Sequence, residues 1–119
     1  MNPLSLSRLV VMACLAWSLP ATHAVEPPAT LRSVFADDFL VGVALGSYQV
    51  NGRVPKAEEV AAKQFSAITP ENEFKWQALH PAPGRYEFKS ADVFANFAKA
   101  HDMKLIGHTL VWHSQTPDW

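Results

Sequence analysis

Apolar residues along the chain occur first as a continuous run and then at helical spacing. Residues 40–46 are an apolar run closed by glycine, which is typical of a strand buried on both faces of a parallel sheet. Residues 54–65 instead place apolar side chains on one helical face, with Pro55 in the first turn and acidic residues near the start. This pattern predicts an amphipathic helix that covers the sheet. The short, partly β-branched segment 66–72, with Pro70 near its end, predicts a second strand.

The second part of the chain repeats this order. Residues 81–86 have the composition of a turn, and Ser90 is the expected N-cap of a helix over residues 91–101, where apolar side chains recur at helical spacing. Residues 104–112 are again largely apolar and predict a third strand. Strand, helix, strand, helix, strand is the order of parallel α/β folds, either a doubly wound sheet or a barrel. Periodicity alone does not distinguish these two architectures.

The N-terminal residues have the pattern of a secretory signal. Arg8 precedes a short apolar run over residues 9–19, and small residues before Ala24 predict cleavage after that position. We therefore interpret residues 1–24 as a signal peptide and residues 25–34 as a linker, which indicates a secreted or periplasmic protein. The apolar run is shorter than the roughly 20 residues that span a bilayer, so no permanent membrane anchor is expected.

Composition narrows the class of partner. The formal net charge is -1 and the signs are interspersed, so the chain offers no basic stripe for nucleic acid and no polybasic segment for lipid. Cys14 is the only cysteine and lies in the expected signal peptide, so no disulfide is predicted; a lipoprotein processing site at Cys14 is the weaker alternative. Gly46 and Gly52 lack the further residues of a nucleotide-binding fingerprint, and we expect no cofactor.

Polar side chains gather where the second predicted strand ends. Glu71, Asn72 and Lys75 combine a carboxylate acceptor, an amide that donates and accepts, and a cationic donor. A pyranose donates and accepts hydrogen bonds around its rim, so these groups suit neighbouring sugar hydroxyls. The alternative is an ordinary solvated ion pair between Glu71 and Lys75, which are four residues apart. The residue types alone favour the ion pair.

A second cluster comes from the third predicted strand. Alternation places His108 and Trp112 on the same face, so a sugar ring stacked on the indole would lie within reach of the imidazole. Gln115 joins them only if the strand has ended and the chain has turned into a loop, which its polar neighbours support. His113 faces away from His108, which argues against a metal site. The alternatives are a histidine satisfied by a backbone carbonyl and a tryptophan that packs in the core.

The two clusters lie in motifs that resemble those of the family 10 glycoside hydrolases, whose best-known members are endo-1,4-β-xylanases. The motifs are Thr-Pro-Glu-Asn-Glu-Phe-Lys-Trp over residues 69–76 and Gly-His-Thr-Leu-Val-Trp-His over residues 107–113. The resemblance implies a (β/α)8 TIM barrel, which is an α/β fold of about 250 residues. Residues 35–119 would then be the first three strands and two helices of this barrel, truncated after the third strand. It also implies substrate binding by Glu71, Asn72, Lys75, His108, Trp112 and Gln115.

The resemblance further implies xylan as the substrate and a retaining mechanism with two catalytic carboxyl groups. The family places these groups after its fourth and seventh strands, which is beyond Trp119, and Glu73 falls at a position without a catalytic role. We therefore expect a fragment of a secreted retaining endo-β-1,4-xylanase that hydrolyses internal β-1,4 bonds and is inactive by itself. The alternatives are a non-catalytic carbohydrate-binding protein and an inactive truncated gene product.

Overall fold

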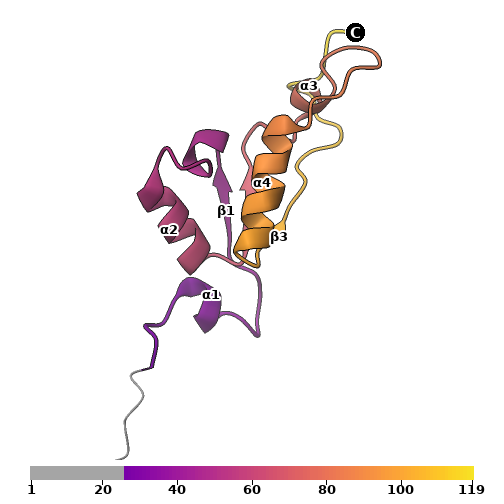
Figure 1. The fold of residues 1–119 in the computed structure, drawn as a ribbon. Helices are drawn as coiled ribbons and strands as arrows, with labels where there is room; N and C mark the ends of the chain where they lie inside the picture. Colours follow the sequence, from indigo (N-terminus) through magenta and orange to yellow (C-terminus); the bar gives the residue numbers. More distant parts are fainter. Residues whose placement is uncertain (1–25) are drawn as a thin grey trace, which may run out of the picture.

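The computed structural model describes residues 26–119, so the predicted signal peptide lies outside the described residues. Figure 1 shows the order of the elements along the chain. They are α1 (Leu31–Val34), β1 (Gly42–Leu45), the 3₁₀ helix η1 (Ser47–Gln49), α2 (Pro55–Gln64), β2 (Ala67–Pro70), α3 (Trp76–Leu79), α4 (Lys89–Ala100) and β3 (Lys104–Leu105). No helix in this part of the chain has the length and apolar character needed to cross a membrane.

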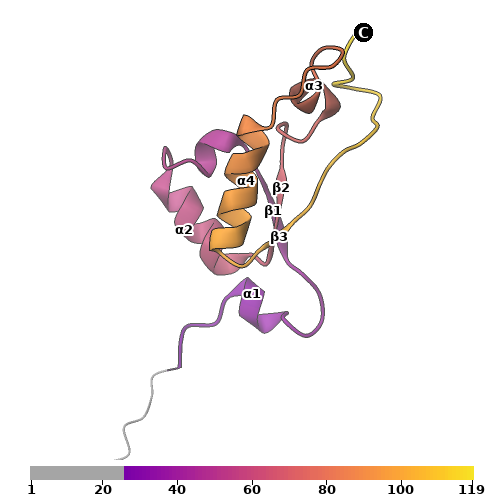
Figure 2. The same ribbon diagram turned by 45° about the vertical axis from the view of Figure 1, so that its right-hand side comes forward.

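The three strands form one parallel sheet in the order β1-β2-β3. Ala67 of β2 is level with Gly42 on one side and with Lys104 on the other. Helices α2 and α4 lie on one side of the sheet, and the segment that follows β3 passes along the other side (Figure 2). This arrangement confirms the predicted parallel α/β fold.

Both long helices begin without a side-chain cap. Pro55 is the first residue of α2, where its missing N–H needs no partner, and Glu58 lies in the first turn, where a negative charge favours the helix dipole. α4 begins at Lys89 with Phe88 in the N-cap position, so the prediction that Ser90 caps this helix is wrong. The backbone explains the earlier start, because Asp92 N–H already donates to the Phe88 carbonyl at 2.8 Å.

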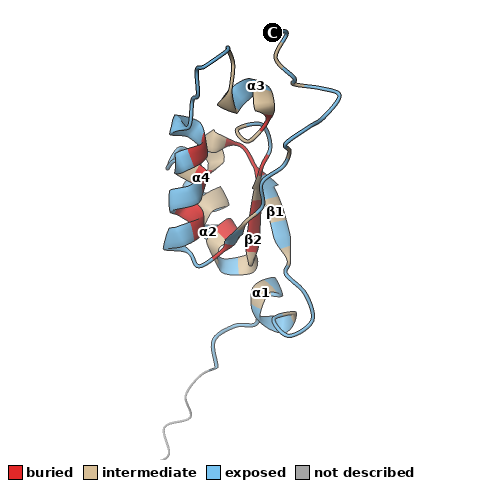
Figure 3. Ribbon diagram, turned by 90° about the vertical axis from the view of Figure 1, so that its right-hand side faces the viewer, coloured by how far each residue is buried: buried red, intermediate tan, exposed pale blue. Residues whose placement is uncertain are grey.

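The core lies between the sheet and these two helices, and Figure 3 shows the buried residues along this contact. Ile68 of β2 and Phe94 of α4 are completely buried and belong to the same hydrophobic core. Burying side chains of this size stabilises the fold by about 1.5 to 3 kcal/mol each. The other buried members of this core are Leu45, Val50, Ala61, Phe97, Ala98 and Met103.

The third strand is much shorter than predicted, ending at Leu105 instead of residue 112. Ser66 and Ile68 accept hydrogen bonds from Lys104 and Ile106, so every second residue of β2 faces β3. Pro70 is the next residue on this side of β2; it keeps a carbonyl acceptor but has no N–H, so it cannot donate to the segment after β3 as the other residues can. The ladder therefore stops there, and residues 106–119 run as an irregular segment in which strand alternation does not apply.

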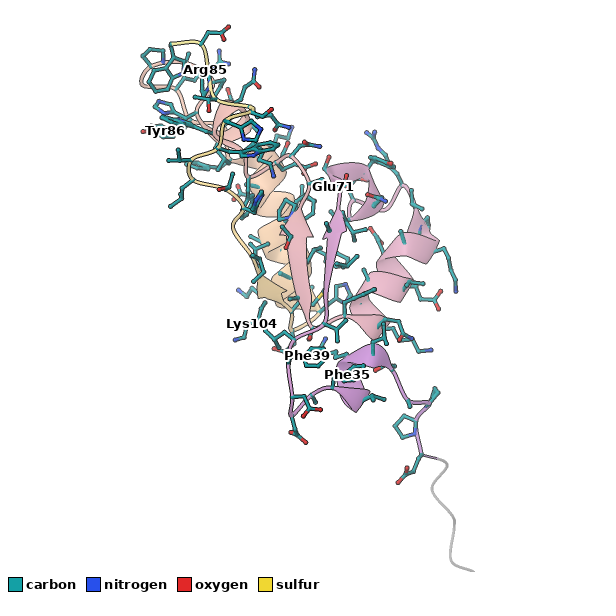
Figure 4. The ribbon with its side chains drawn as sticks, turned by 180° about the vertical axis from the view of Figure 1, so that it is seen from behind. Phe35, Phe39, Glu71, Arg85, Tyr86 and Lys104 are labelled. Atoms are coloured by element: carbon teal, nitrogen blue, oxygen red, sulfur yellow. The ribbon has the colours of Figure 1, made fainter. Side chains whose placement is uncertain are left out.

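The amino ends of the strands are joined to the start of the chain. Helix α1 lies within the segment expected to be a linker, and Arg32 donates hydrogen bonds to the carbonyl oxygens of His101 (2.8 Å) and Asp102 (2.6 Å). Phe35 and Phe39 stack nearby, with ring centroids 4.8 Å apart, and Figure 4 shows them at the end of the sheet opposite to Glu71. The carboxyl ends of the strands are thus left for the polar clusters.

Candidate functional site

The site is built from the segments that follow β2 and β3 at the carboxyl ends of the strands. Figure 4 shows Glu71 directly beyond the tip of β2. The backbone fixes this position, because Glu71 N–H donates to the Leu45 carbonyl at 3.0 Å and so continues the contact between β2 and β1. In parallel barrels this end of the strands carries the active site.

Lys75 is the centre of the cluster. It is only 5% exposed, and among residues 26–119 it is the one charged residue that is buried. Its ammonium nitrogen lies 2.8 Å from His108 Nδ1, 3.3 Å from the His108 carbonyl oxygen and 5.3 Å from the ring centroid of Trp112. The ring centroids of His108 and Trp112 are 6.3 Å apart. These three residues therefore form one contact group, whose members come from the two separate motifs.

The contact between Lys75 and His108 fixes the tautomer of the imidazole. An ammonium group has donors and no lone pair, so His108 Nδ1 must accept the hydrogen bond, and the ring proton must lie on Nε2. His108 Nε2–H is then a donor for a ligand. The contacts with His108 use two of the three N–H groups of Lys75, so the third can also donate to a ligand.

The Lys75 charge is not neutralised by a carboxylate. Among residues 26–119 the ion pairs are Arg32–Asp102, Lys56–Glu59 and Arg85–Glu87, and the alternative pair between Glu71 and Lys75 is not formed. Burying a cation without a counter-ion is unfavourable unless its hydrogen-bonding groups are satisfied. The tryptophan ring offsets part of this penalty through a cation–π contact. Such an arrangement is expected where the cation serves a bound ligand.

Asn72 and Gln115 form a second contact between the two segments. Gln115 Nε2 donates to Asn72 Oδ1 at 2.9 Å, and the Gln115 carbonyl accepts from Gln77 N–H at 2.9 Å. Gln115 has a φ of 52°, so the chain has left the strand and turned at this position. Gln115 thus reaches Asn72 because the chain has turned into a loop, which is the condition expected from the sequence.

The remaining aromatic and histidine residues have other surroundings. Trp76 packs edge-on against Trp119 with ring centroids 5.8 Å apart, which agrees with a packing role. Trp112 keeps 37% of its surface exposed, so its ring is accessible to a ligand. His113 packs against Trp112 with ring centroids 5.2 Å apart, and no group of three metal-binding side chains converges within the described residues.

Glu73 has contacts that the sequence analysis did not foresee. Its Oε1 accepts a hydrogen bond from Ser47 N–H at 2.7 Å, and its Oε2 accepts one from Asn72 N–H at 3.1 Å. The carboxylate therefore joins the loop after β1 to the loop after β2. Sequence reasoning missed this role because Glu73 lies three residues after the end of β2 and no local pattern predicts its contact with the loop after β1. Next to it is a cavity of about 350 Å³, lined by Ser47, Asn72, Glu73, Ala78, Glu87, Lys89 and Ser90.

The chain is similar to known proteins of one family. The profile of glycosyl hydrolase family 10 matches residues 30–119. The chain is 41% identical over 90 residues to Beta-1,4-xylanase of Dictyoglomus thermophilum, covering 76% of this chain and 24% of that protein. It is 44% identical over 89 residues to Endo-1,4-beta-xylanase A of Thermoanaerobacterium saccharolyticum, covering 75% of this chain and 8% of the relative. The chain thus spans a quarter or less of the length of these relatives.

The fold also matches solved structures of the family. The crystal structure of xylanase 10B from Thermotoga petrophila in complex with xylobiose superposes with a TM-score of 0.74 and 35% sequence identity. The match covers 81% of this chain and 30% of that protein. The chain therefore belongs to glycosyl hydrolase family 10, and its three parallel strands are part of the family's α/β barrel.

Proposed function

We propose that this chain forms the part of a secreted, retaining endo-1,4-β-xylanase that binds the sugar on the non-reducing side of the scissile bond. The observation that carries this proposal is the group made by Lys75, His108 and Trp112, in which two unused donors lie beside an accessible aromatic face. Membership of the xylanase family and the xylanases among the relatives support xylan as the substrate.

The groups present match the surface of a xylose unit. The ring of Trp112 offers an apolar platform on which the C–H face of a pyranose can stack. Lys75 and His108 supply donors for adjacent hydroxyl oxygens, and the exposed Glu71 carboxylate supplies an acceptor for hydroxyl protons. The Asn72–Gln115 pair extends the polar surface from the loop after β3 to the loop after β2. A neutral sugar of this size needs donors, acceptors and an apolar face together.

The chemical step requires two carboxyl groups about 5 to 5.5 Å apart in a retaining enzyme. We propose that both are supplied by the part of the family's barrel that lies beyond the position of Trp119. The residues of the present chain then contribute by holding the substrate, which raises the rate only as far as their contacts strengthen in the transition state. We also propose export to the periplasm or the medium, as the N-terminal signal pattern indicates.

The test is a completed barrel, in which residues 30–119 replace the corresponding segment of Thermotoga petrophila xylanase 10B. Circular dichroism and a thermal melt establish that the chimera has folded. A folded chimera should release reducing ends from xylan, and faster than from a soluble β-1,4-glucan. A folded chimera without activity on xylan would contradict the proposal, because the transplanted segment would then supply no productive sugar site.

The coding sequence downstream of Trp119 separates this proposal from a non-catalytic carbohydrate-binding protein. Two glutamates in the contexts of the family's acid/base and nucleophile support the enzyme. Their absence would favour a protein that binds β-1,4-linked sugar without cleaving it.

A further inference from the structure

Glu73 lies in the loop after β2, next to Asn72. Its side chain leaves the loop after β2, and its two carboxylate oxygens accept from backbone N–H groups of two different loops, at Ser47 and Asn72. Hydrogen bonds to a carboxylate are about twice as strong as bonds between neutral groups. The Glu73 carboxylate is therefore a firm connection between η1 and the segment that carries Asn72.

The connection continues beyond Asn72. Asn72 Oδ1 accepts from Gln115, and the Asn72 carbonyl accepts from Lys75 N–H at 2.9 Å. A polar chain of Ser47, Glu73, Asn72 and Gln115 thus links the loops that follow β1, β2 and β3. Asn72 is the member of this chain that belongs to the sugar-binding group, and Glu73 fixes its backbone.

The loop after β1 is itself built to receive the Glu73 carboxylate. Gly46 N–H donates to Gln49 Oε1 at 2.6 Å, which closes the first turn of η1 and leaves Ser47 N–H, the next donor, for Glu73. Ser47 is the first residue of a helical turn, where the backbone N–H has no partner within the helix. Glu73 provides the acceptor that this position lacks.

We propose that Glu73 is a positioning residue that acts through Asn72: it locks the loop after β2 against η1 and so holds the Asn72 amide in register for the sugar. This inference rests on the proposed function, since it assigns to Glu73 a role in the same sugar site. Glu73 itself does not need to touch the substrate.

Two substitutions break the connection from opposite ends. Glu73→Gln keeps the size of the side chain, but its NH2 group then faces a backbone donor, so one of the two hydrogen bonds is lost. Ser47→Pro removes the N–H that Glu73 accepts, at a first helical position that tolerates proline and follows a residue with extended backbone. Glu87→Gln is the matched control, because it removes a carboxylate from the same cavity without touching either backbone donor.

The experiment is a double-mutant cycle in the completed barrel, with kcat/KM measured on xylotriose. Glu73→Gln and Ser47→Pro should each lower kcat/KM about 10-fold, as expected for loss of a charged hydrogen bond. Glu87→Gln should change it less than 2-fold. In the Asn72→Ala background, Glu73→Gln should lower kcat/KM by less than about 2-fold, because the residue through which it acts is gone. Equal effects of Glu73→Gln with and without the Asn72 side chain would overturn the proposal.

Amide hydrogen exchange provides a readout that does not depend on activity. In Glu73→Gln, exchange at Ser47 and Asn72 should accelerate about 10-fold or more, while exchange at Ile68 in the buried strand stays unchanged. Unchanged exchange at Ser47 and Asn72 would overturn the connection itself. If exchange accelerates as expected but Asn72→Ala leaves kcat/KM at the wild-type value, the sugar-binding role of Asn72 fails and Glu73 is a stabilising contact only.

Discussion

Replacement of Lys75 by methionine is expected to separate substrate binding from stability. Methionine has a similar unbranched stem and fills the buried site, but it has no charge and no N–H group. The substitution removes the two contacts with His108 and the donor proposed for the sugar. It also removes a buried cation that has no carboxylate partner among residues 26–119, and this relief opposes the loss of the hydrogen bonds.

The effect of Lys75→Met on kcat/KM should be larger than its effect on stability. A hydrogen bond from a charged group contributes about 1.5 to 3 kcal/mol, so kcat/KM on xylotriose should fall about 10- to 150-fold. The loss of the Lys75–His108 bond and the relief of cation burial are of similar size and opposite sign. The free energy of unfolding should therefore change by less than about 1 kcal/mol, and the melting temperature by no more than about 4 °C.

The assay combines a thermal melt of the completed barrel with initial rates on xylotriose. Lys63→Met, at an exposed position of α2, is the matched control and should leave kcat/KM unchanged. A Lys75→Met variant that melts more than about 10 °C lower but retains wild-type kcat/KM would show that Lys75 is a structural residue and not a sugar-binding one.

Three further outcomes are expected. Trp112→Ala should lower kcat/KM on xylotriose at least as much as Lys75→Ala, because the sugar loses the ring on which it stacks. Trp112→Phe should retain part of the activity. If both Trp112 variants were as active as the wild type, Trp112 would not be a sugar platform. His108→Ala should lower kcat/KM by about 10- to 150-fold, because the sugar loses a donor and Lys75 loses its partner, and a silent variant would contradict this. The polypeptide of residues 26–119 alone should release no reducing ends from xylan. It should also lack a cooperative melt, because Leu110 and Val111 are 90% and 78% exposed. Sharp near-ultraviolet dichroism with a cooperative transition would contradict the expectation about folding.

The elements with strong local signals could be predicted from the sequence. The apolar run that contains β1 gave the right type of element, although only Leu45 of this strand is buried in the structure, so the expected burial on both faces is not seen. The amphipathic pattern of α2 also gave the right type of element, because burial of one helical face leaves a distinct spacing of apolar residues. The start of α4 was misplaced by its expected cap at Ser90, since the helix begins earlier without any side-chain cap. Cap residues indicate only one of the ways in which a helix can start.

The end of the third strand and the contacts of Glu73 could not be predicted from local sequence patterns. Residues 106–112 are apolar enough for a strand, but the neighbouring strand presents Pro70 where a donor is needed, and this depends on the register between distant segments. Lys75 and His108 were placed in one site by the family resemblance, although the strand alternation used for His108 and Trp112 does not hold in the structure. Glu73 makes contacts with a loop 26 residues away, and the residues around it carry no pattern that predicts such a contact.

A crystal structure of the completed barrel with xylobiose would show which residues hold the sugar. We expect a xylose unit stacked on the Trp112 ring, with hydroxyl oxygens within about 3.2 Å of Lys75 Nζ and His108 Nε2. The Asn72 amide should contact the same or the adjacent sugar. A xylobiose bound elsewhere on the barrel, with Lys75, His108 and Trp112 free of sugar, would contradict the claim that these residues form the sugar-binding site.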